Sequence, residues 1–139
     1  MKLEILALCD AATDSQGKLN LLGAFDHIWS RKIPMIHPFC AIALRIRLSK
    51  TEQGKHRIRI NFIDADGKIV IPTLDGTLNI KCPADENSIA ANLILQVQHL
   101  KLERFGEYSI DITVDGEHQG SLPLFVKQLQ TPSTDEVKE

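Results

Sequence analysis

Four arginines at alternate positions are the residues of this chain whose type and spacing most clearly suggest binding chemistry. Arg45 and Arg47 lie in one run of alternating apolar residues, and Arg57 and Arg59 lie in the next. A guanidinium group can donate two parallel hydrogen bonds to one phosphate or carboxylate group. If the two runs pair as a hairpin with matched apolar faces, Arg47 lies opposite Arg57, and Arg45 lies opposite Arg59. We therefore predict a compact basic patch on one outer face of a sheet.

Like charges across a sheet repel, so this predicted patch needs a compensating negative charge. One interpretation places Glu107 and Asp111 on a strand beside residues 39–48, where they neutralise the arginines within the molecule. Exposed pairs of this kind contribute about 0–1 kcal/mol each. The other interpretation assigns the negative charge to a partner: an acidic protein surface, a nucleic-acid backbone or a phosphorylated ligand. The sequence leaves both interpretations open.

The charge distribution favours an acidic protein over nucleic acid. Eight basic residues and one acidic residue give residues 31–61 a formal charge of +7, so the rest of the chain, whose total is −2, carries −9. A net negative chain lacks the basic footprint of most nucleic-acid binders. One tryptophan and one tyrosine also leave few aromatic side chains on which bases could stack.

The segment from residue 26 to residue 39 is the second candidate for an interaction surface. It contains two prolines, which favour an irregular crossing between sheets, and the single tryptophan of the chain, Trp29. One interpretation is that its apolar residues cap an open end of the fold. The alternative is a protein interface formed by Trp29, Arg31 and Met35, because Trp, Met and Arg are enriched in interfaces.

The sequence offers little support for metal binding or catalysis. The residues from Asp64 to Gly67 resemble the start of a calcium loop, but the glycine and glutamate positions that should follow hold Ile69 and Asp75. We interpret them as a hairpin turn. The five histidines lack zinc-ligand spacing, and no nucleophile elbow or phosphate-binding glycine loop is present. We predict a protein that is not an enzyme and has no metal or cofactor.

Alternating apolar and polar residues indicate the elements that must position these side chains. The pattern is typical of half-buried antiparallel strands, and Asp-Gly dipeptides mark turns between them. We predict an all-β, antiparallel, immunoglobulin-like sandwich of about eight strands over residues 1–129, followed by a polar, disordered tail over residues 130–139. Gly23, alone in a strand, indicates a bulge. The predicted strands cover residues 2–9, 18–29, 39–48, 55–64, 76–82, 89–99, 107–114 and 119–128.

Two resemblances add detail. Tyr108, at the start of a strand that ends in an Asp-Gly turn, resembles the tyrosine corner of immunoglobulin-like sandwiches, where the hydroxyl bonds to an upstream backbone group. The cysteine of antibody domains is replaced by Ile110. The chain as a whole resembles a family of small uncharacterised bacterial proteins, a domain of unknown function. That resemblance implies no activity and rests on Cys9-Asp10-Ala11-Ala12, Leu22-Gly23-Ala24-Phe25-Asp26, His37-Pro38, the arginine runs and Val114-Asp115-Gly116.

The compartment and the function follow as expectations. Cys9, Cys40 and Cys82 are widely spaced, so we predict reduced, buried thiols in a cytoplasmic protein without a signal peptide or membrane span. We predict a non-catalytic interaction or accessory module with an unknown, acidic protein partner, and homo-oligomerisation through a sheet edge is a further option. The alternative is a protein that binds a small anionic or phosphate ligand with the same arginines, and an enzyme of unknown type is the third option.

Overall fold

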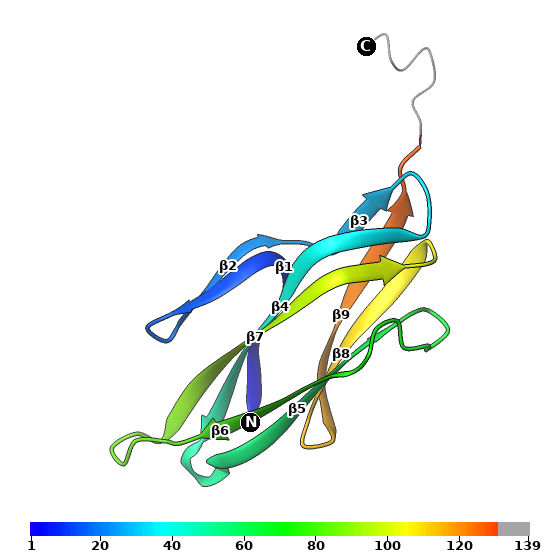
Figure 1. Ribbon diagram of the computed structural model, residues 1–139. Coiled ribbons are helices and arrows are strands. Elements are labelled where there is room, and N and C mark those ends of the chain that lie inside the picture. The colour runs from blue at the N-terminus through cyan, green and yellow to red at the C-terminus, as the bar shows by residue number, and fades with distance from the viewer. Residues whose placement is uncertain (131–139) are drawn as a thin grey trace.

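The computed structural model describes residues 1–130, so residues 131–139 of the predicted tail lie outside the described part. The described residues form an all-β sandwich of two sheets, as the alternation predicts (Figure 1). The first sheet has the order β2 (Lys18–Ala24), β1 (Lys2–Ser15), β4 (Met35–Ser49) and β7 (Ser88–Leu102). The second has the order β3 (His27–Ser30), β9 (Glu117–Gln128), β8 (Gly106–Val114), β5 (Gly54–Ile63) and β6 (Leu74–Ile80).

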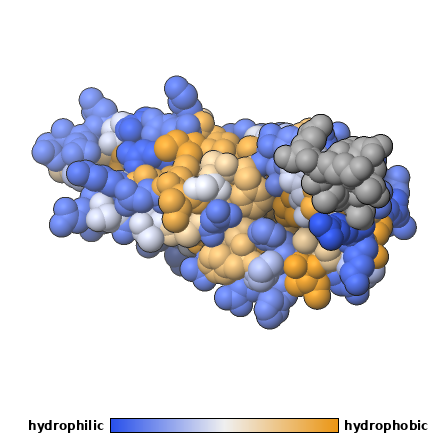
Figure 2. Space-filling model, turned by 90° about the horizontal axis from the view of Figure 1, so that it is seen from above, coloured by the Kyte–Doolittle hydropathy of each residue, from blue (hydrophilic) through white to orange (hydrophobic). Residues whose placement is uncertain are grey.

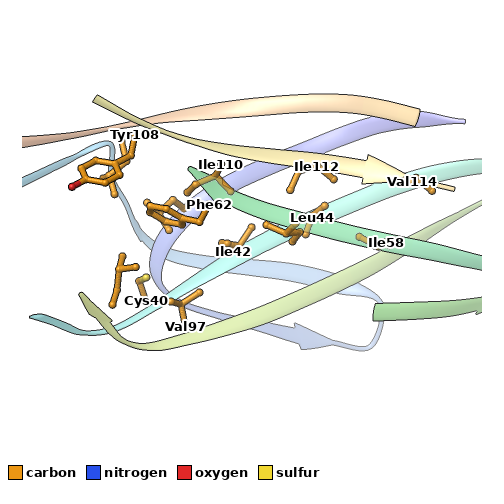
Figure 3. Packing of buried hydrophobic residues seen from close by; sticks show 14 of the residues in the cluster. Cys40, Ile42, Leu44, Ile58, Phe62, Val97, Tyr108, Ile110, Ile112 and Val114 are labelled. Atoms are coloured by element: carbon orange, nitrogen blue, oxygen red, sulfur yellow. The ribbon is translucent and has the colours of Figure 1, made fainter. Parts of the chain in front are cut away.

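The core lies between the sheets and is built from the inward residues of each alternating strand (Figure 3). Ile42 and Leu44 of β4 face the second sheet, from which Phe62 of β5 and Ile110 of β8 point back towards them. All four side chains are buried. Burying one such side chain stabilises the fold by about 1.5–3 kcal/mol relative to leaving it exposed.

The predicted hairpin between the two arginine runs is wrong. β4 pairs with β1 and β7, whereas β5 pairs with β6 and β8 in the other sheet. A short 3-10 helix, Lys50–Glu52, follows β4 and leads the chain from one sheet to the other. The alternation defines which side chains face the core, but two strands with inward apolar rows can lie opposite one another as well as side by side. Here they lie in opposite layers.

The predicted strand over residues 18–29 is two strands, which gives nine strands in the described part of the chain rather than about eight. β2 pairs with β1 in the first sheet, and β3 runs parallel to the end of β9 in the second. The chain changes sheet at Phe25 and Asp26. The amide of Phe25 donates to the Leu8 carbonyl on one side, and the Asp26 carbonyl accepts from the Phe125 amide on the other.

The first strand, β1, pairs with two different strands along its length. Its first half pairs with β4, and from Cys9 onwards it pairs with β2. The β1–β2 hairpin thereby covers part of the outer face of the first sheet, where Cys9, Ala41 and Ala43 are buried against Leu19 and Ile94. Small side chains at residues 41 and 43 allow this close approach, which explains why apolar residues occupy the outer row of β4.

Gly23 lies in this hairpin and does not form the predicted bulge. The pairing of β1 with β2 keeps one register on both sides of it. Gly23 has a φ of +69°, and a Cβ atom placed there would lie 2.4 Å from Asp10 Oδ2. The residue must therefore be glycine for two reasons: its left-handed backbone and the neighbouring carboxylate.

Two local predictions are confirmed. The Tyr108 hydroxyl donates to the Arg104 carbonyl at 2.7 Å and accepts from the Arg104 amide at 3.2 Å, which is the geometry of a tyrosine corner. Cys9, Cys40 and Cys82 are buried and unpaired. Burial is the main cause that raises the pKa of the Cys40 thiol, to about 11, so this thiol is not activated.

Candidate functional site

The arginines of β4 lie on the outer face of the first sheet and share one carboxylate from the first strand. Glu4 Oε1 accepts from Arg45 Nε at 3.2 Å, and Glu4 Oε2 accepts from Arg47 Nε at 2.7 Å. The hydrogen bond from Arg47 is the main cause that holds the pKa of Glu4 below its usual value, against partial burial. Arg47 also donates to the hydroxyl of Ser88 on β7.

Arg45 has a second role, because it holds the tip of the β1–β2 hairpin on the sheet. Its Nη1 donates to the Gly17 carbonyl at 3.2 Å and to Asn92 Oδ1 at 3.0 Å. The Asn92 amide in turn donates to the Gly17 carbonyl and to Asp14 Oδ2, both at 3.1 Å. The hydrogen-bond donors of Arg45 therefore bind groups within the molecule: Glu4, the hairpin tip and β7.

The arginines of β5 lie on the outer face of the opposite sheet and are balanced by β6. Arg59 Nε donates to Asp75 Oδ1 at 3.0 Å, and Arg57 Nε lies 3.6 Å from the same oxygen. The hydrogen bond from Arg59 is the main cause that lowers the pKa of Asp75. The register places Asp75 directly opposite Arg59.

Internal neutralisation therefore occurs, but not with the predicted carboxylates. β8, which carries Glu107 and Asp111, lies between β5 and β9 and is not beside β4. Asp111 Oδ1 instead accepts from the hydroxyls of Ser109 and Ser121. The four arginines form two separate pairs on opposite faces, each holding a carboxylate, so they do not form one anion-binding patch.

The Trp29 segment has a different character. β3 places Ile28 in the core, 6% exposed, and leaves Trp29 55% exposed on the neighbouring position. Met35 packs against the core, and Arg31 is exposed in the turn between β3 and β4. The capping interpretation therefore fits Ile28 and Met35, whereas Trp29 is largely available to a partner.

A cation and an aromatic ring lie beside the exposed indole. Lys127 Nζ, from the neighbouring strand β9, lies 5.7 Å from the centre of the Trp29 ring. The ring of His27 lies on the same strand at 6.2 Å and nearly parallel to the indole. Within residues 1–130, neither Arg31, Lys32 nor Lys127 forms an ion pair. We call Trp29, Arg31, Lys32, Met35 and Lys127 the Trp29 end.

An open pocket of about 430 Å³ lies beside the indole. His37 lines it, and its Nε2 is buried without a hydrogen-bond partner in the described part of the chain. Figure 2 looks onto the upper end of Figure 1 and shows apolar surface across the middle of this face, bordered by polar side chains. The residues that line the pocket are Asp10, Phe25, His27, Ile28, Trp29, Met35 and His37.

Sequence reasoning missed four of the residues that matter here. The sequence-based prediction pairs the arginines with Glu107 and Asp111 rather than with Glu4 and Asp75, although both of these occupy outward positions of alternating runs. Lys127 and His37 approach Trp29 only because β3 pairs with β9 and the chain returns through β4. No local pattern contains that information.

A comparison with models of protein families identifies the family of this chain. The model described as a family of unknown function (DUF6941) matches residues 4–127. The chain belongs to this family. The match covers most of the chain and confirms the resemblance to a domain of unknown function. No curated protein matches the sequence.

Two further observations bear on the chemistry open to this family member. The carboxylate of Asp64 accepts from the amides of Asp66 and Lys68, which is the geometry of a tight turn, as predicted. Residues 1–130 contain no group of three or more His, Cys, Asp or Glu side chains placed to hold a metal ion. They also contain no helix of the length and hydropathy needed to cross a membrane.

Proposed function

We propose that this chain is a non-catalytic interaction module that binds an acidic protein partner through the Trp29 end. The observation that carries the proposal is the 55% exposure of the single tryptophan beside Lys127 and just before Arg31 and Lys32 in the chain, three cations without ion pairs in the described residues. Tryptophan and arginine are the residues that most often dominate binding energy in protein interfaces. The paired arginines of β4 and β5 are not part of this surface.

A complementary partner would present an apolar side chain flanked by carboxylates. The pocket beside Trp29 gives the apolar side chain a place to bind, and Arg31, Lys32 and Lys127 lie in or beside the elements that surround it. Rim charges of this kind raise the association rate and the salt dependence more than the final affinity. The proposal therefore includes binding that weakens as salt concentration increases.

The architecture supports an interaction role. The order β1-β4-β7 facing β9-β8-β5-β6 follows the A-B-E and G-F-C arrangement of immunoglobulin-like sandwiches, and the tyrosine corner occupies the matching strand. We infer an immunoglobulin-like fold for this chain on these two grounds. The three unpaired cysteines support a reducing compartment such as the cytoplasm.

Affinity capture from native lysate with matched variants tests the proposal. Trp29→Ala and the pair Arg31→Gln with Lys32→Gln should each lose a partner that the unmodified chain retains. The pair Arg57→Gln with Arg59→Gln should retain it, because these arginines lie on another face and already hold Asp75. A partner that is lost only with Arg57 and Arg59 would refute the proposed surface.

A further inference from the structure

The strand β7 is a long sheet edge without a partner in the described part of the chain. It pairs with β4 along one side, from Ser88 to Leu102. None of the backbone hydrogen bonds that residues 1–130 form outside their strand pairs involves a residue of β7. Its outer side therefore presents a row of free N–H and C=O groups, which is a template for another strand.

β7 also lacks the features that usually protect such an edge. It contains no proline, no glycine and no charged residue from Ser88 to Leu100, and its irregular backbone residue, His99, lies near its end. The other edge strands are protected by charge or by length. β2 begins with Lys18, β3 has four residues and β6 contains Asp75.

The side chains of β7 are half-buried in a way that an added strand would complete. Leu93 and Leu95 face the core opposite Leu44 and Ile42 of β4, yet both remain partly exposed. Ile94, on the outer face, packs against the buried Ala41 and Ala43 and is also partly exposed. Apolar side chains thus border the free edge on both faces of the sheet.

We propose that two copies of this chain associate antiparallel along β7 and form one continuous eight-stranded sheet. An isologous pair suits this strand because its centre is apolar and uncharged, so it meets itself without repulsion. The ends differ in sign: Asp85 and Glu86 precede the strand, whereas Lys101 and Arg104 at its end outnumber Glu103 by one charge. Lys101 and Arg104 also form exposed ion pairs with Glu103 and Asp66 within the chain, so the attraction between the ends of two copies is weak. Antiparallel pairing brings the acidic end of each copy towards the basic end of the other, and parallel pairing does not.

Sedimentation velocity or light scattering over a concentration series tests this proposal. The unmodified chain should have twice the monomer mass at high concentration. The pair Gln96→Lys with Gln98→Lys should be monomeric at the same concentration, because lysines on an edge strand disfavour the addition of another strand. Both glutamines are exposed, so the variant should keep its melting temperature.

The matched control places the same added charge on another edge. Asn20→Lys with Leu22→Lys on β2 should leave the dimer intact. Amide exchange of the unmodified chain gives an independent measurement, in which residues 89–98 should exchange more slowly as the chain concentration rises. A monomer at about 100 μM, a dimer that survives the β7 lysines, or a dimer lost with the β2 lysines would each overturn the proposal.

Discussion

At the residue scale, carboxylates within the molecule balance the charge of the four alternating arginines that stand out in the sequence. Glu4 compensates Arg45 and Arg47, and Asp75 compensates Arg57 and Arg59. The alternation predicts that all four arginines point outwards, which is correct. It does not predict that they point in opposite directions, because a pattern of faces contains no information about which layer a strand joins.

The contact between His56 and Asp115 should make stability depend on pH. The hydrogen bond to Asp115, at 2.6 Å, is the main cause that raises the pKa of His56. Because the pKa of His56 is higher in the folded state than in the unfolded state, the contact stabilises the fold fully below about pH 6.5. This stabilisation is lost as the pH rises through the folded-state pKa. The unmodified chain should therefore lose about 1 kcal/mol of stability towards pH 8–9.

Chemical denaturation at a series of pH values measures this effect. His56→Gln should remove the pH-dependent part of the stability. His118→Gln should keep it, because the His118 side chain bonds to Ser121 rather than to a carboxylate. Equal slopes for the unmodified chain and His56→Gln would contradict the prediction.

The hydroxyl group of the tyrosine corner should contribute to the stability of the fold. Tyr108 is 3% exposed, and its hydroxyl bonds to both backbone groups of Arg104. Tyr108→Phe keeps the ring in the core and leaves the Arg104 carbonyl without this donor. We expect a loss of about 1 kcal/mol in urea denaturation. A neutral result would mean that the corner is not a stabilising element.

At the element scale, the β1–β2 hairpin is the part of the fold that sequence reasoning predicted least well. The alternation predicts its strands but not its position over the outer face of the sheet. That position depends on small residues at Ala41 and Ala43 and on the bonds from Arg45 and Asn92 to the Gly17 carbonyl. The partners are far apart in sequence, so periodicity alone cannot identify them.

Gly23 should be the most sensitive glycine of this hairpin. Gly23→Ala should destabilise the fold by about 1–2 kcal/mol through its left-handed backbone, and more if the Asp10 carboxylate cannot move. Gly76→Ala on β6 is the control, because a Cβ there meets nothing within 4 Å. Similar losses of stability in both variants would refute this explanation.

At the scale of the whole molecule, adjacent residues of β3 lie in opposite environments. Ile28 is buried and Trp29 is 55% exposed. Ile28→Ala should cost about 2–5 kcal/mol. Trp29→Ala should change stability by less than about 0.5 kcal/mol, as expected of an exposed side chain. A large loss in Trp29→Ala would favour the capping interpretation, and thermal or urea denaturation of both variants decides between the two.

The all-β sandwich and its core could be predicted from the sequence because inward residues such as Ile42, Ile60 and Ile110 repeat with period two. The surface could be predicted only in part. Trp29 and Arg31 were identified by residue type, but Lys127 joins them through the parallel pairing of β3 with β9, which no local pattern indicates.

Retention on an immobilised polyanion at about 50 mM salt tests the central claim most directly. Two variants lose the same charge: Arg31→Gln with Lys32→Gln at the Trp29 end, and Arg57→Gln with Arg59→Gln on β5. The unmodified chain should be retained, the first variant should elute earlier, and the second should elute with the unmodified chain. Earlier elution of the second variant alone, or no retention of the unmodified chain, would contradict the assignment of the Trp29 end as the binding surface.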